Sequence, residues 1–118
     1  MSRWVLAFSA FVGLLASSPV LAADGAKTFQ LQCMTCHQAV SGPAGPSLAG
    51  VSGRKIASLA GYKFSAGLSA KSAMTWTDTN LENYLAAPAK FAPGTRMMTG
   101  LAAPADRAAV IGYLKTLK

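Results

Sequence analysis

The feature that most constrains this chain is the segment Cys33-Met34-Thr35-Cys36-His37, which holds both of its cysteines and its one histidine. Two cysteines separated by two residues and followed directly by histidine form the attachment sequence of a c-type haem. Two thiols on one turn of helix can add to the two vinyl groups along one edge of a porphyrin, and the adjacent imidazole then reaches the iron. The segment therefore predicts one haem c, covalently bound through Cys33 and Cys36, with His37 as an axial ligand.

Two other chemistries also use closely spaced cysteines. A Cys33–Cys36 disulfide, with or without thioredoxin-like redox activity, suits an oxidising compartment. Redox motifs of that type occur in a βαβ context, and no Val/Ile-rich strand pattern precedes Cys33. A structural zinc site needs a fourth cysteine or histidine, which this sequence lacks. We therefore favour haem, which would also provide the centre of the core in a chain too short to bury much surface of its own.

The first 22 residues have the pattern of a secretory signal peptide. Arg3 is followed by an apolar run from Trp4 to Ala16 and then by small residues that end at Ala22 and Ala23, the kind of site that signal peptidase cuts. A membrane anchor is the alternative, but the run is shorter than the ~20 residues that span a bilayer. We expect cleavage after Ala22 or Ala23, export to the periplasm, and one remaining domain, 23–118, without an integral membrane segment.

Helical patterns and turn signals together predict an all-α domain. The expected helices or helical turns run from Asp24 to about Cys36, Arg54 to about Leu59, Ala66 to about Ala70, Thr77 to just before Pro88, and Pro104 to about Leu117. Phe29 is expected on a buried face of the first helix. The segment 42–53 is rich in Gly and Pro and is expected to be a loop.

An iron bound by His37 has a second axial position, and the sequence offers no second histidine for it. Met34 lies between the cysteines and cannot reach the other side of the ring, and we expect Met74 to be a core residue. The residues leave Met97, Met98 or no ligand, in a loop whose Pro and Gly allow it to approach the ring. Thioether ligation suits iron in this setting and raises the reduction potential.

The chain from Gly25 to Lys115 resembles a class I cytochrome c of the mitochondrial and purple-bacterial soluble type. The matching residues are Gly25, Phe29, Gly45-Pro46-Ser47-Leu48, Gly53-Arg54-Lys55, Trp76, Tyr84, Pro93-Gly94-Thr95-Arg96-Met97, Val110 and Tyr113. The resemblance implies a small all-α fold of about four to five helices around one covalent haem, with the N- and C-terminal helices packed together. It also implies that Met97, rather than Met98, is the sixth ligand of the iron.

The resemblance further implies roles for residues around the haem. The carbonyl of Pro46 would accept the N–H of the proximal imidazole and so fix its orientation. Arg54 would lie beside a haem propionate, and the indole N–H of Trp76 would donate to a propionate. Tyr84 would lie on the methionine side. Phe64 stands where the family usually has a tyrosine that binds a propionate, so we expect that hydrogen bond to be absent.

The charge is strongly basic, with 11 Lys and Arg against 4 Asp and Glu and a formal net charge of +7. The basic residues that flank segments expected near the haem edge are Lys27, Lys63, Lys71, Lys90 and Arg96. Such a surface can steer a protein to redox partners with acidic docking surfaces. Nucleic acid is disfavoured because no recognition helix or aromatic–basic interleaving is present. A solvated basic face with no partner is the alternative.

These observations predict a soluble, monomeric, periplasmic one-electron carrier, part of an electron-transport system such as a respiratory chain, and not an enzyme. Saturation of the iron by His37 and Met97 would leave no site for oxygen or peroxide. Three alternatives remain open: a small peroxidase or gas-reactive haem protein if the sixth position is vacant, an electron-transfer subunit of a larger dehydrogenase or oxidase, and a haem-free thiol oxidoreductase.

Overall fold

The computed structural model describes residues 12–13 and 23–118. The predicted signal peptide, 1–22, lies outside the described residues apart from 12–13. Regular structure in the described ranges is helical, with two isolated β-bridges, Gly42–Gly45 and Lys55–Thr75. No helix in this part of the chain combines the length and the apolar character needed to cross a membrane.

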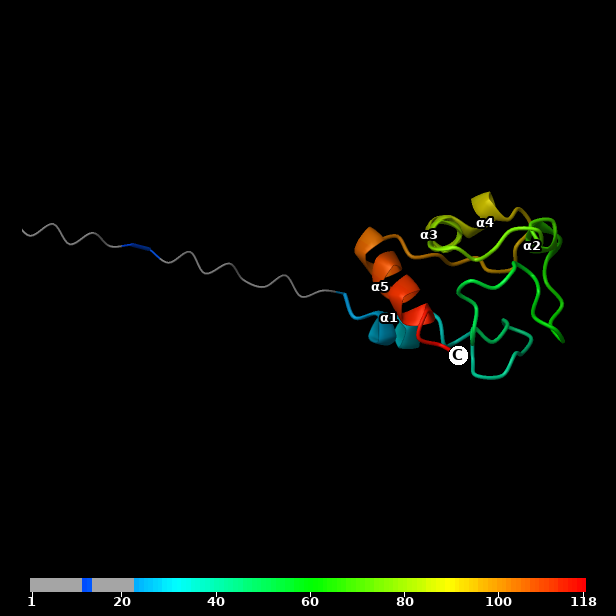
Figure 1. Cartoon of the computed structure of the whole chain (residues 1–118), viewed down its shortest axis with the longest axis horizontal. Coiled ribbons are helices and arrows are strands. Elements are labelled where there is room, and N and C mark those ends of the chain that lie inside the picture. Colours follow the sequence, from blue (N-terminus) through cyan, green and yellow to red (C-terminus); the bar gives the residue numbers. More distant parts are fainter. Residues whose placement is uncertain (1–11, 14–22) are drawn as a thin grey trace, which may run out of the picture.

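The helices of the described residues are α1 (Gly25–Gln32), α2 (Ala66–Ser69), α3 (Asp78–Ala86), α4 (Pro88–Phe91) and α5 (Pro104–Leu114), as Figure 1 shows. This arrangement confirms the predicted all-α class. The side-chain oxygens of Asp24 and Thr77 cap α1 and α3, each 3.2 Å from the backbone nitrogen three residues further on. Pro104 occupies the first turn of α5, where its missing N–H leaves no hydrogen bond unmade.

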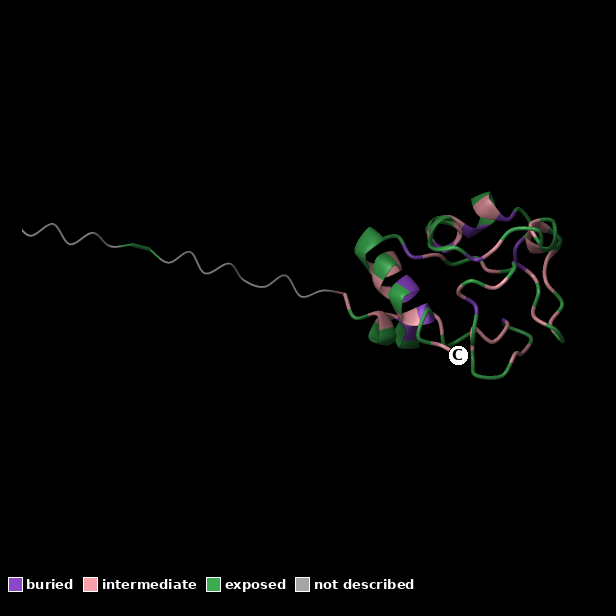
Figure 2. Cartoon of the chain, in the orientation of Figure 1, coloured by how far each residue is buried: buried purple, intermediate pink, exposed green. Residues whose placement is uncertain are grey.

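The first and last helices pack against each other, as expected (Figure 1). A Cβ atom at Gly25 would overlap the carbonyl oxygen of Ala109, so glycine allows α1 to approach α5 this closely. One turn further along, the rings of Phe29 and Tyr113 lie 5.1 Å apart at 53°. α3 packs against α5 and against α4. Figure 2 shows that these helices bury one side and keep the other exposed.

The predicted helix from Arg54 to Leu59 does not form. Its backbone pairs with a distant segment instead: Ile56 N donates to Met74 O at 2.9 Å, and Trp76 N donates to Arg54 O at 2.8 Å. Backbone groups of 54–56 that pair with residues 74–76 cannot also form the hydrogen bonds of a helix. The choice between the two depends on a contact between distant parts of the sequence, which a local pattern does not reveal.

Two smaller predictions are wrong, and one short helix was not predicted. α1 ends at Gln32 rather than near Cys36, because the amide of Met34 donates to Phe29 O at 3.1 Å, the carbonyl that already accepts from Cys33 N at 2.8 Å, and so leaves the regular helical pattern. Pro88 ends one helix, as expected, but also begins α4 in the first-turn position that suits proline. Met74 is 37% exposed and is not a core residue, since it lies in the turn between α2 and Trp76.

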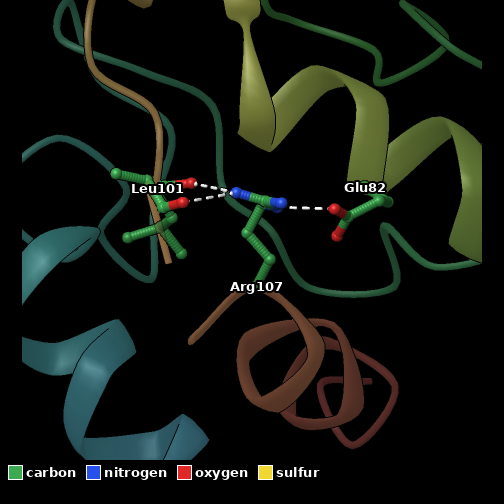
Figure 3. Close-up of polar contacts among 4 residues, drawn as sticks. Glu82, Leu101 and Arg107 are labelled. Atoms are coloured by element: carbon green, nitrogen blue, oxygen red, sulfur yellow. Dashed lines mark hydrogen bonds and ion pairs between the residues drawn. The ribbon is translucent and has the colours of Figure 1, made fainter. Parts of the chain in front are cut away.

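Arg107 of α5 fixes the chain that enters this helix, as Figure 3 shows. Its Nε donates to Glu82 Oε1 at 2.6 Å, and its Nη1 donates to Leu101 O at 2.8 Å and to Ala102 O at 2.9 Å. The amide of Leu101 in turn donates to Leu85 O on α3, at 2.8 Å. The end of the loop that carries Met97 and Met98, residues 92–102 (the methionine loop), is thereby attached to both α3 and α5.

Candidate haem site

The imidazole of His37 is held by one backbone carbonyl. Its Nδ1 lies 2.8 Å from Pro46 O. Because a carbonyl oxygen only accepts, Nδ1 carries the hydrogen in this contact, which leaves the lone pair of Nε2 free to bind a metal. The structure thus brings His37 and Pro46 together in the arrangement that the resemblance implied.

The loop behind the imidazole lies very close to it. A Cβ at Gly45 would be 2.9 Å from Cys36 O and 3.1 Å from ring atoms of His37, so only glycine fits without a shift. The same loop is braced by a serine pair, in which Ser47 N donates to Ser41 Oγ at 2.9 Å. These contacts hold the proline carbonyl where it can orient the ring.

Both cysteines come from the turn that ends α1. Cys33 is half-buried and packs against the core, whereas Cys36 is exposed, and both thiols are free. Burial raises the pKa of the Cys33 thiol. Because Cys36 and His37 follow on the same turn, one short segment presents two thiols and one imidazole together.

Burial alternates along the methionine loop. Thr95 is 7% exposed and Met97 packs partly buried against the core, whereas Arg96 is exposed and Met98 is 81% exposed. In an extended segment, successive side chains point to opposite sides. Met97 therefore lies on the inner side with Thr95, and Met98 lies on the outer side.

Thr95 connects the methionine loop to α3, a role that the sequence analysis missed. Its Oγ1 lies 2.6 Å from the Tyr84 hydroxyl and accepts the amide hydrogen of Met97 at 3.2 Å. Burial raises the pKa of Tyr84, and its hydrogen bond to Thr95 opposes that rise. No sequence signal identifies Thr95 as an inward residue, because Thr95-Arg96-Met97-Met98 is two polar residues followed by two apolar ones, without the period-two alternation of a half-buried extended segment.

Arg54 and Trp76 are neighbours through their paired backbones. Trp76 is buried, and its ring centroid lies 5.2 Å from that of Tyr84 and 5.8 Å from that of Phe91. Arg54 Nη1 donates to Ala49 O at 2.9 Å, and burial lowers the pKa of the guanidinium.

One nitrogen of Arg54 is left without a partner. Its Nε is buried and makes no hydrogen bond within the described protein. An unsatisfied buried donor on a charged group is costly, and an anionic oxygen would satisfy it. A haem propionate is such a group, so this orphaned donor, the free Nε2 of His37 and the inward thioether of Met97 all fit a haem.

Charge is distributed unevenly over the fold. Of the two ion pairs of the described residues, Glu82–Arg107 at 2.6 Å joins α3 to α5, and Asp78–Lys115 at 2.7 Å joins α3 to the residue that directly follows α5. The sequence has no acidic residue in 25–77 or 83–105, the segments that carry the candidate site. The exposed basic side chains of these segments are Lys27, Lys55, Lys63, Lys90 and Arg96.

This fold and site define a small all-α domain suited to a covalent haem, and comparison with known proteins gives its family. The cytochrome c family model matches residues 22–118, so the chain belongs to the cytochrome c family. Cytochrome c2 iso-2 of Magnetospirillum fulvum is 50% identical over 98 residues, which are 80% of this chain and 100% of that protein. Cytochrome c of Cannabis sativa is 41% identical over 95 residues, which are 77% of this chain and 85% of that protein.

A solved structure supports the same family. Cytochrome cH from Methylobacterium extorquens superposes with a TM-score of 0.70 at 39% identity, covering 80% of this chain and 99% of that one. Family membership supports an electron carrier with covalently bound haem c and redox partner proteins, rather than an enzyme.

Proposed function

We propose that residues 23–118 form a soluble, monomeric, periplasmic carrier of single electrons, with haem c bound through Cys33 and Cys36 and iron bound by His37 and Met97. The observation that carries this proposal is the position of Met97 on the inner side of its loop, with Met98 81% exposed on the outer side. If His37 and Met97 both bind the iron, no site would remain for oxygen or peroxide, which favours electron transfer over catalysis.

The chain's own residues hold both ligands in place. Pro46 O fixes the tautomer and orientation of His37, while Thr95 Oγ1 holds the backbone of Met97. When bound, haem supplies a one-electron iron couple. Ligands that the protein already fixes need little rearrangement when the charge of the iron changes, which suits rapid electron exchange.

Two further residues would donate hydrogen bonds to the propionates of the haem. Arg54 offers its unpaired Nε to a propionate, and Trp76, whose backbone pairs with that of Arg54, supplies its indole N–H to a propionate. Tyr84 lies on the methionine side, where its hydroxyl acts through Thr95.

Partner proteins with acidic docking surfaces fit the charge distribution. No exposed basic residue of 25–77 and 83–105 takes part in either ion pair of the described residues, so these positive charges are available to attract an acidic surface. Attraction of this kind mainly raises the rate of encounter.

The proposed location depends on the signal peptide, 1–22. Intact mass measurement of the protein recovered from a periplasmic fraction tests it directly. Cleavage after Ala22 or Ala23 together with the added mass of one haem is expected. A chain that keeps residues 1–22 would contradict the proposed export and processing.

Absorption spectra of the exported, haem-loaded protein test the proposed ligands. We expect covalent haem and a weak far-red sulfur-to-iron band in the oxidised protein. Covalent haem with a five-coordinate reduced spectrum would instead indicate an open sixth position and a small haem enzyme. A mass without haem would favour a thiol oxidoreductase, and stable copurification with a larger redox enzyme would favour a subunit role.

A further inference from the structure

Arg96 connects two loops that are distant in the sequence. Its Nη2 donates to Lys63 O, 33 residues away, and to the Tyr62 hydroxyl at 3.3 Å. Its Cζ also lies 5.6 Å from the centroid of the Tyr62 ring, within the range of a cation–π contact. We propose that Arg96 is a positioning residue, whose contacts with Tyr62 and Lys63 keep the Met97 thioether on the iron; this rests on the proposed ligation by Met97.

The alternation of the loop places Arg96 opposite its neighbours. Thr95 and Met97 face inward, and the inner side is held by the hydrogen bond between Thr95 and Tyr84. Arg96 faces outward and holds the other side through the Tyr62 and Lys63 loop. Thr95 and Arg96, the two residues that precede Met97, are therefore held from opposite sides of the loop.

Polar contacts, rather than close packing, join the loops at this point. A cavity of about 250 Å³ opens beside the guanidinium, lined by Ser41, Gly42, Pro43, Gly61, Tyr62, Lys63 and Arg96. Because of this cavity, few neighbouring atoms could hold the two loops together if the contacts of Arg96 were removed. Tyr62 is itself braced, since its ring meets that of Phe64 edge-on at 4.9 Å.

Guanidinium chemistry suits this position. A planar guanidinium can donate in a fixed geometry to a carbonyl and a hydroxyl while it stacks over an aromatic face, which an ammonium group does not reproduce. Removing the side chain should increase how often the loop opens, while α1, α3 and α5 keep their packing. Such local opening costs less free energy than global unfolding and can be measured separately.

Displacement of Met97 by an added ligand measures loop opening. The ferric, haem-loaded protein is mixed with neutral imidazole, and loss of the far-red sulfur-to-iron band is followed at saturating imidazole. For Arg96→Ala we expect a rate ~10-fold above wild type, which corresponds to about 1.4 kcal/mol. A neutral probe avoids changes in attraction when a positive charge is removed.

Matched variants separate the contact from the charge. Tyr62→Leu should also speed the displacement of Met97. The double variant should be no faster than Arg96→Ala, because both substitutions remove the same contact between Arg96 and Tyr62. Lys71→Ala is the control: it removes a positive charge and a cation–π contact, in which Lys71 Nζ lies 4.7 Å from the centroid of the Phe91 ring, and among the described residues Lys71 makes no hydrogen bond to 95–98. In Lys71→Ala, imidazole should displace Met97 at the wild-type rate. The denaturant midpoint of Lys71→Ala should be close to that of Arg96→Ala, so that the two variants differ in loop opening and not in global stability.

Each contrary result has a distinct meaning. A wild-type protein without the sulfur-to-iron band would overturn both the ligation by Met97 and the role of Arg96. A wild-type protein with the band, whose Arg96→Ala variant exchanges at the same rate, would overturn the role of Arg96 alone. Equal acceleration by Lys71→Ala would also overturn it, because the effect would then come from charge.

Discussion

The hydroxyl of Tyr84 lies 2.6 Å from Oγ1 of Thr95, and this buried pair joins α3 to the loop that carries Met97. The same Thr95 oxygen accepts the amide hydrogen of Met97 at 3.2 Å. One hydroxyl group therefore connects a helix of the core to the backbone of the proposed iron ligand, and its removal should affect both stability and ligation.

Thr95→Val should lower the free energy of unfolding by ~1–3 kcal/mol, because it leaves the buried Tyr84 hydroxyl without its partner. Thr95→Ser keeps the oxygen and should cost less. In Tyr84→Phe/Thr95→Val neither polar group remains, so the double variant should lose less than the sum of the single losses. Denaturant unfolding of the haem-loaded proteins measures these values, and strictly additive losses would contradict a shared hydrogen bond.

Met97→Ala and Met98→Ala should behave differently although the residues are adjacent. Met97 is partly buried against the core and Met98 is 81% exposed, so only Met97→Ala should abolish the sulfur-to-iron band and lower the reduction potential. Met98→Ala should retain both properties. Absorption spectra and redox titration check this, and loss of the band in Met98→Ala alone would assign the ligand to Met98.

The sequence predicted those parts of the structure that follow from local patterns. Phe29 is expected on a buried face of the first helix and is buried in α1, and Val110, which the resemblance matches to the last helix, is buried in α5. The turn of Cys33, Cys36 and His37 was identifiable because its chemistry is contained in five consecutive residues.

Contacts between segments that are far apart in the sequence could not be predicted from local sequence patterns. The bond from Tyr84 to Thr95 spans 11 residues and that from Arg96 to Lys63 spans 33, so neither leaves a periodic signal. The wrong helix at Arg54 has the same origin, because its backbone pairs with Trp76. Local preference is readily overridden where a distant segment offers hydrogen bonds.

Two helical glycines should respond in opposite directions to substitution by alanine. A Cβ at Gly25 would overlap Ala109 O across the contact between α1 and α5, so Gly25→Ala should destabilise the protein by ~1–3 kcal/mol. At Gly112, in α5, a Cβ would have open space around it, so Gly112→Ala should raise the free energy of unfolding by ~0.5–1 kcal/mol through reduced backbone entropy of the unfolded chain. Urea unfolding compares them, and a stabilised Gly25→Ala would show that the helices can move apart at little cost.

Electron exchange with an acidic redox protein should slow as salt is added. Screening shortens the range of surface charges from ~30 Å at 0.01 M to ~3 Å at 1 M ionic strength, and steering contributes ~10- to 10³-fold to association rates. Lys90→Gln should lower the low-salt rate, because Lys90 is exposed in a segment without acidic residues. Lys115→Gln is the matched control, since the same charge is removed where Lys115 Nζ is already paired with Asp78 at 2.7 Å.

Stopped-flow rates over a series of salt concentrations decide between steering and a merely solvated basic surface. The rates of the wild type, Lys90→Gln and Lys115→Gln proteins should converge at high salt, because only the screened, long-range contribution distinguishes them. A rate that does not change with salt would show that the basic surface does not guide the partner. Equal losses in Lys90→Gln and Lys115→Gln would show that net charge matters and that its position in the segments around the haem site does not.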